Sequence, residues 1–130
     1  MDWQVIRQSI FVFGSNLAGR HGKGAALTAH LAYGAHYGIG EGPTGNAYAI
    51  PTKDRQLKTL ALTRIQHAVE RFLRYAHDHP ELTFTVTRIG CGLAGYTDAQ
   101  ISPMFQTAPA NCILPPNWRQ VPGEKTWIGK

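Results

Sequence analysis

Three clusters of glycine constrain this chain more than any other feature, because each lies where one expected element of secondary structure gives way to the next. The first occupies residues 14–26, after the apolar run at 10–13. The second occupies residues 38–45 and the third residues 90–95. Glycine has no Cβ, so the backbone can approach a ligand closely and point its N–H groups at oxygen atoms. A strand, a glycine loop and a helix N-terminus together form an anion site, which predicts a phosphate-bearing ligand at the carboxyl ends of a sheet.

Hydrophobic periodicity gives the order of the elements. Short apolar or alternating runs predict strands, and alanine-rich stretches or apolar residues spaced by three and four predict helices. Pro51 is expected to end the second strand. Strands that alternate with helices predict an α/β fold, with a mostly parallel sheet covered on both faces. Strands are expected at 10–13, 46–51, 82–89 and 112–114, and helices at 23–35, at 60–79 and from Thr97–Asp98 to Phe105.

The composition fits a globular protein. The chain has 130 residues, 43% of them hydrophobic, so one domain over residues 1–130 is expected, with residues 115–130 as a tail. No apolar stretch could cross a bilayer and no signal-peptide pattern is present, so a cytoplasmic protein without a membrane partner is expected. Two cysteines are too few for a disulfide framework, and no metal-site spacing is seen. The formal charge of +5 favours an anionic partner.

Two nucleotide-binding motifs are excluded by their context. Residues 40–45 match the letters of a dinucleotide-binding loop, but a strand rather than a helix follows them. The first glycine cluster lacks the lysine followed by serine or threonine that a Walker A loop needs. Residues 36–45 are instead expected to form a mobile loop that folds over the ligand, with Tyr37 or Ile39 shielding a ribose or base, or else a plain connector.

Polar residues in these loops have both a functional and a structural interpretation. Asn16 follows a strand and can bind a ribose hydroxyl or form a turn. Arg20, His21 and Lys23 can pair with phosphate or form an exposed basic loop. Cys91 has no identifiable base, so an inert, packed thiol is favoured over a nucleophile.

A family resemblance rests on Asn16 and on residues 22–26, 50–53 and 88–93. Together they resemble macro domains, most closely the branch that contains the terminal ADP-ribose protein glycohydrolase, over residues 10–114. The Arg-Ile-Gly-Cys-Gly-Leu string at 88–93 is the most specific part. The first glycine loop is also similar to small macro-like proteins of bacteria and their phages, which implies the host cytoplasm if the chain is phage-encoded.

The resemblance implies a three-layer α/β/α fold that binds ADP-ribose or a related NAD-derived nucleotide, with no metal or cofactor. ADP-ribosylated protein or nucleic acid is a further implied partner. The first and third glycine loops would clamp the diphosphate and the distal ribose between them. The implied ligand-binding residues are Asn16, Arg20, His21, Gly22, Lys23, Gly24, Ala25, Thr52, Gly90, Cys91, Gly92, Leu93, Ala94, Gly95 and Tyr96.

The resemblance also implies two catalytic candidates, Lys53 and Asp98. Lys53 lies in the region of a lysine that forms a covalent ADP-ribose intermediate in that branch. Ala94 stands where the branch has an acidic catalytic residue, so recognition or sequestration is expected ahead of catalysis. Asp98 is the nearest acid and could equally cap a helix.

Two alternatives to simple binding stay open. The first is an enzyme, either an ADP-ribosyl hydrolase or a phosphatase acting on ADP-ribose 1″-phosphate, with His21 as a further acid or base. The second is a basic nucleic-acid-binding module, which rests on the net charge alone.

Overall fold

The computed structural model describes residues 9–118, in which strands and helices alternate as expected. Most of the expected tail, residues 119–130, lies outside the described part of the chain. No helix among the described residues is long and apolar enough to cross a membrane. The strands are β1 (Ser9–Asn16), β2 (Gly42–Thr44), β3 (Ala47–Lys53), β4 (Thr83–Val86) and β5 (Cys112–Ile113), and the helices are α1 (Gly24–Tyr33), α2 (Leu62–Asp78), α3 (Asp98–Ile101) and the 3₁₀ turn η2 (Ser102–Phe105).

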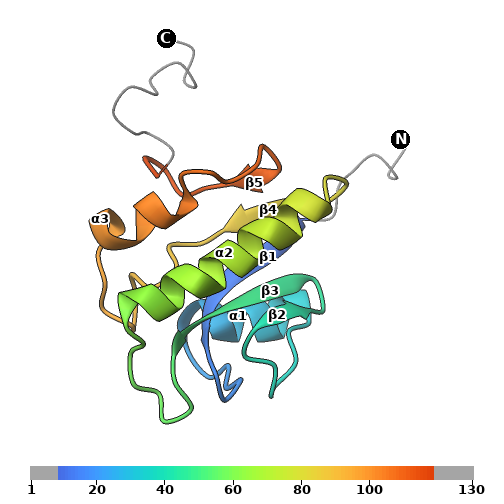
Figure 1. The fold of residues 1–130 in the computed structure, drawn as a ribbon. Coiled ribbons are helices and arrows are strands. Elements are labelled where there is room, and N and C mark those ends of the chain that lie inside the picture. The colour runs from blue at the N-terminus through green and yellow to red at the C-terminus, as the bar shows by residue number, and fades with distance from the viewer. Residues whose placement is uncertain (1–8, 119–130) are drawn as a thin grey trace.

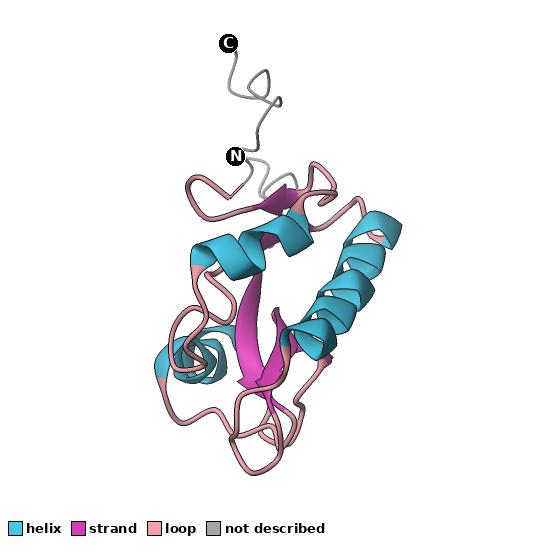
Figure 2. Ribbon diagram, turned by 60° about the vertical axis from the view of Figure 1, so that its left-hand side comes forward, coloured by secondary structure: helices cyan, strands magenta, loops and turns pink. Residues whose placement is uncertain are grey.

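The five strands form one mixed sheet in the order β2-β3-β1-β4-β5. β1 pairs in parallel with both β3 and β4, β4 pairs in parallel with β5, and only β2 is antiparallel. Figure 1 shows α2 in front of the sheet and α1 behind it, and the turned view of Figure 2 agrees. The expected α/β fold, with a mostly parallel sheet between helical layers, is therefore confirmed.

Each face of β1 is buried against a different helix. Val12 and Phe13 are consecutive residues with no exposed surface, and they lie in two different hydrophobic clusters. Phe13 packs with the alanines of α1, whose small side chains let that helix approach the sheet closely. Val12 belongs to the larger cluster, which also contains buried residues of α2, η2 and β5. This burial on both faces is typical of a central parallel strand.

Helix α2 has the periodicity expected from the sequence. Six apolar residues recur at a spacing of three and four and are buried, while most of the residues between them are exposed. Phe72 lies at the centre, with ring centroids 4.9 Å from Tyr48 and 5.4 Å from Phe84. The buried residues of α2 are Ile65, Ala68, Val69, Phe72, Leu73 and Ala76.

Two local expectations are wrong. The second glycine cluster is not only loop, because Gly42–Thr44 forms the edge strand β2 and pairs with Ala47–Ala49 of β3. Pro51 does not end β3, which continues to Lys53. Proline is tolerated there because β2 pairs only with residues 47–49, and the β1–β3 register shifts beside Pro51, between Ser15 and Asn16.

The packing around Phe72 makes a direct prediction about stability. Phe72→Ala should lower the free energy of unfolding by about 3–5 kcal/mol, because it leaves a cavity between α2 and the sheet. Urea denaturation measures this loss. Leu31→Ala is the control, since Leu31 of α1 is 74% exposed and its truncation should cost less than about 0.5 kcal/mol. Equal losses in the two variants would contradict the packing described here.

Candidate functional site

A cavity of about 710 Å³ is lined by residues at the carboxyl ends of β1 and β3, by the loop after β4 and by the start of α1. This volume is in the range of roughly 300–1,000 Å³ that small-molecule sites occupy. The carboxyl edge of a parallel sheet is also where α/β proteins bind their ligands. The lining residues are Gly14, Ser15, Asn16, Arg20, Gly22, Lys23, Gly24, Ala25, Ala26, Thr52, Lys53, Leu57, Thr87, Arg88, Gly90, Cys91, Gly92, Leu93 and Ala94.

Most of the residues expected from the sequence lie together in this cavity, including Lys53 and both glycine loops. Four of the expected residues do not line it: His21, Gly95, Tyr96 and Asp98. Tyr96 instead donates its hydroxyl to the Leu60 carbonyl at 2.7 Å. Six lining residues were not among those expected: Gly14, Ser15, Ala26, Leu57, Thr87 and Arg88. Arg88 lies two residues before the third glycine loop and could have been found from that position, whereas nothing in the sequence around Leu57 marks it.

The start of α1 forms one wall of the cavity. An α-helix leaves its first N–H groups without an intrahelical partner, and the N-cap residue Lys23 provides no side-chain cap. No acidic residue occupies the first turn of α1. Lys23, Gly24, Ala25 and Ala26 all line the cavity. The positive end of the helix dipole is therefore available to an anion there.

The charge of the lining is entirely positive. Arg20, Lys23, Lys53 and Arg88 contribute cationic side chains, and no Asp or Glu is among the lining residues of the described chain. Among the residues that the structure describes, Arg88 is the one of these four cations that pairs with an acidic side chain, that of Asp98. The cavity is thus suited to a ligand with more than one negative charge.

The buried side chain of Asn16 organises the first glycine loop. Its Nδ2 donates to the Arg20 carbonyl at 2.8 Å, and the Arg20 N–H donates to its Oδ1 at 3.0 Å. These two bonds close a tight turn, which is the structural role considered for Asn16 from the sequence. The same side chain also lines the cavity, so one donor and one acceptor site of its amide remain for a ligand.

His21 lies behind the cavity wall rather than in the cavity. Its side chain is fully buried, and its Nε2 donates to the His36 carbonyl at 2.9 Å. Its ring lies edge-on to Phe13 at 5.5 Å and to Tyr37 at 5.3 Å. Its Nδ1 has no hydrogen-bond partner in the described part of the chain. Because the His21 side chain is buried outside the cavity, it neither contacts a ligand nor acts on one as an acid or base, contrary to the expectation from the sequence.

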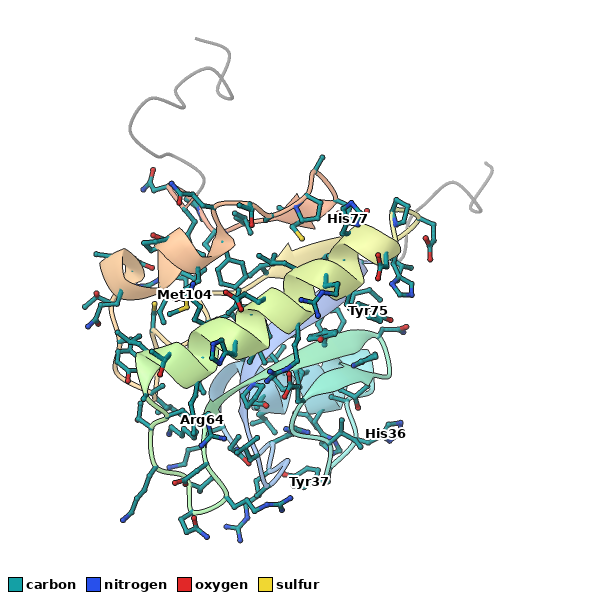
Figure 3. All side chains as sticks on the ribbon, in the orientation of Figure 1. His36, Tyr37, Arg64, Tyr75, His77 and Met104 are labelled. Carbon is teal, nitrogen blue, oxygen red and sulfur yellow. The ribbon has the colours of Figure 1, made fainter. Side chains whose placement is uncertain are left out.

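The segment 36–45, which the sequence predicts as a lid over the ligand or a plain connector, does not line the cavity. It packs on the far side of the first glycine loop, where the Gly38 N–H donates to the Gly19 carbonyl at 2.9 Å. Tyr37, labelled with His36 in Figure 3, makes an edge-on contact with His30 of α1 at 4.7 Å. The described structure therefore uses this segment as a support for the loop.

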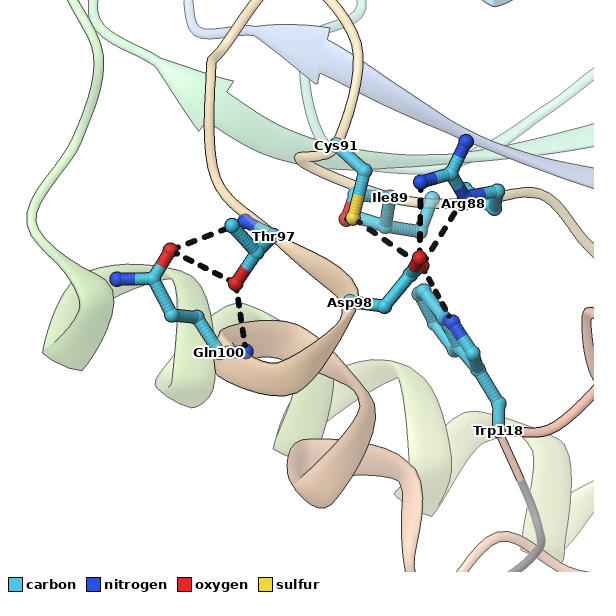
Figure 4. Close-up of polar contacts among 7 residues, drawn as sticks. All are labelled: Arg88, Ile89, Cys91, Thr97, Asp98, Gln100 and Trp118. Carbon is cyan, nitrogen blue, oxygen red and sulfur yellow. Dashed lines mark hydrogen bonds and ion pairs between the residues drawn. The ribbon is translucent and has the colours of Figure 1, made fainter.

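Asp98 is a hub that holds the third glycine loop (Figure 4). Arg88 donates to its two carboxylate oxygens at 3.0 and 2.9 Å, and Trp118 Nε1 donates to Oδ1 at 2.8 Å. The thiol of Cys91 lies 3.7 Å from Oδ1. The helix cap is Thr97, which forms a capping box with Gln100, and Asp98 is the first residue of α3.

These contacts shift the pKa values of Asp98 and Cys91. Hydrogen bonds from Arg88 first, and then from Trp118, lower the pKa of Asp98 below the ordinary value for aspartate. Burial, and then the charge of Asp98, raise the pKa of the Cys91 thiol. Asp98 is therefore an ionised acceptor that positions Arg88, and Cys91 remains a thiol rather than a nucleophilic thiolate. A carboxylate with a lowered pKa is a poor proton donor at neutral pH.

A scan against protein-family models, a search of curated proteins and a search of solved structures each found no match to this chain. The geometry of the cavity therefore carries the functional argument.

The lowered pKa of Asp98 predicts how stability depends on pH. An ionised Asp98 stabilises the fold above the ordinary aspartate pKa of about 4, and this contribution is lost as the pH falls through the lower pKa of the folded state. Asp98→Asn should therefore reduce stability at neutral pH, and the difference from wild type should narrow in acid. Urea denaturation at a series of acidic and neutral pH values measures this difference in the free energy of unfolding. Asp78→Asn, at the exposed end of α2 and away from Asp98, is the control for a general effect of removing a carboxylate. A constant difference between wild type and Asp98→Asn would contradict this role.

Proposed function

We propose that this chain binds ADP-ribose or a related NAD-derived nucleotide. One observation carries the proposal: a single cavity joins the uncapped start of α1, the third glycine loop and four cationic side chains, with no carboxylate among its lining residues. A diphosphate presents the charge and the oxygen atoms that such a wall of N–H groups and cations favours. The resemblance of the same loops to macro domains supports this class of ligand.

Hydroxyl groups in the cavity favour a sugar next to the diphosphate. Ser15 donates to the Gly40 carbonyl, Thr52 to the Ser15 carbonyl and Thr87 to the Val12 carbonyl. Each hydroxyl has used its one donor on the backbone, so its oxygen can only accept a further hydrogen bond. Acceptors of this kind on Thr52 and Thr87 suit the donor hydroxyls of a ribose, whereas the Ser15 hydroxyl is directed at the segment behind the cavity wall. All three residues line the cavity.

Binding is favoured over catalysis because the described residues of the cavity lining provide no carboxylate. Ala94 lines the cavity at the position where the resembled branch has its catalytic acid, and the carboxylate of Asp98 is engaged by Arg88 and Trp118. We therefore propose recognition or sequestration of the nucleotide as the function. ADP-ribosylated protein or nucleic acid is the partner that would present the same group.

The binding proposal is tested by Gly92→Val. A Cβ on Gly92 meets no other atom within 4 Å, so the fold should accept the valine, whose methyl groups would then occupy space at the cavity lining. Calorimetry with ADP-ribose should show at least about a tenfold loss of affinity, with an unchanged melting temperature. Leu31→Ala, remote from the cavity, should bind as wild type does.

Two results would overturn the binding proposal. The first is wild-type protein that does not bind ADP-ribose, NAD or ADP-ribose 1″-phosphate. The second is affinity for single-stranded nucleic acid that falls steeply with salt while no mononucleotide binds, which would favour the nucleic-acid module.

Lys53 favours the enzyme alternative, because its amine belongs to a cavity-lining residue at the end of β3. If the chain removes ADP-ribose from a modified protein, Lys53→Ala should reduce the turnover rate far more than the affinity for ADP-ribose. Release of ADP-ribose from modified protein, and of phosphate from ADP-ribose 1″-phosphate, measures this. Lys58→Ala, in the turn that follows β3, is the control, since Lys58 does not line the cavity. Wild-type protein without turnover on either substrate would leave binding as the function.

A further inference from the structure

Leu57 has a backbone conformation that its side chain disfavours. Its φ is +65°, in the left-handed region, and it is the one non-glycine residue of the cavity lining for which a positive φ is recorded. A bulky residue in this region is an outlier, because its Cβ crowds the following carbonyl oxygen. The side chain of Leu57 does not compensate by burial in the core, since the residue is 42% exposed.

The turn around Leu57 explains why the backbone must adopt this conformation. The Leu57 N–H donates to the Asp54 carbonyl at 3.0 Å, and the Asp54 N–H donates to the Lys58 carbonyl at 2.7 Å. The Asp54 carboxylate also accepts from the N–H groups of Gln56 and Lys58. Short hairpin loops of this kind place glycine at the left-handed position. This chain has leucine there, on the edge of the cavity.

A second exposed leucine lines the same cavity from the third glycine loop. Leu93 is 66% exposed, and its Cδ1 lies 3.9 Å from the position that a Cβ on Gly24 would take at the start of α1. The two leucine loops are tied together, because Thr59 donates to the Ala94 carbonyl at 3.0 Å and Tyr96 donates to the Leu60 carbonyl at 2.7 Å. Leu57 and Leu93 thus lie on two cavity-lining loops that are joined by hydrogen bonds.

We propose that Leu57 and Leu93 form an apolar subsite that takes a flat heteroaromatic ring of the nucleotide, and that the strained conformation of Leu57 is retained for this contact. The inference rests on the proposed function. Strained residues that persist in a well-bonded turn are concentrated at ligand sites. The charged side chains of the cavity lining are all cationic, and Leu57 and Leu93 are its large aliphatic side chains. Aliphatic side chains can pack against the apolar face of a ring, which the cationic groups suited to phosphate cannot do. Adenine and nicotinamide share this chemistry.

Ligands with and without a ring test the proposal. Leu57→Ala and Leu93→Ala should each weaken binding of ADP-ribose by about tenfold, while binding of ribose 5-phosphate, which has no ring, should stay unchanged. AMP and nicotinamide mononucleotide identify the ring, since the one that occupies the subsite should lose affinity in both variants. Leu31→Ala is the matched control, because Leu31 is an exposed leucine that does not line the cavity.

The substitution Leu57→Gly separates a binding role from a structural one. Glycine relieves the left-handed strain, so the melting temperature should be unchanged or higher, while ring-dependent affinity should fall as it does in Leu57→Ala. A lower melting temperature together with unchanged affinity would show that Leu57 serves packing and would overturn the proposal. Wild-type protein that binds no nucleotide would overturn the proposed function as well. Wild-type binding of ADP-ribose that neither leucine variant changes would overturn the ring subsite alone.

Discussion

The cavity depends on close backbone packing between the first glycine loop and the segment behind it. A Cβ on Gly19 would overlap the carbonyl carbon of Gly38, and a Cβ on Gly40 would overlap the Asn16 carbonyl oxygen. Ser15 adds a buried hydrogen bond to the Gly40 carbonyl. Because backbone meets backbone here, any larger residue at Gly19 or Gly40 would push the loop away from its support. The wall that presents Asn16, Arg20 and the start of α1 is held in place from behind, without contribution from a ligand.

A wall fixed in this way reduces the ordering that a ligand must bring about, which favours affinity. The opposite wall is fixed by different means. There the carboxylate of Asp98 fastens Arg88 and Trp118, and the hydroxyls of Thr59 and Tyr96 fasten the third glycine loop to the loop of Leu57. One wall thus uses backbone contact and the other uses side-chain hydrogen bonds. The cationic residues of both walls line one cavity whose shape is set by contacts within the protein.

The sequence predicts those parts of the structure that depend on local pattern. The period of α2, the alternation before Gly90 and the small residues of α1 are local signals, and the elements they predict are present. The first and third glycine loops can be predicted because each follows a strand, and both line the cavity. What the sequence could not supply depends on contacts between distant residues. Edge strand β2 exists because β3 pairs with it, and His21 is buried because residues 36–41 fold over it. The partners of Asp98 are ten residues or more away, apart from Cys91.

The absence of acid from the cavity lining bears on both binding and chemistry. A carboxylate at position 94, next to the third glycine loop, would provide a base or a proton donor for hydrolysis, but it would also repel a diphosphate held by the same loop. Alanine at that position provides neither the repulsion nor an acid–base group. Asp98 does not restore the acid function, because its charge is matched by Arg88 within one bidentate pair. The described part of the chain thus places no carboxylate in the cavity lining, and the charge of Asp98 outside it is already matched, which supports the proposal of binding over cleavage.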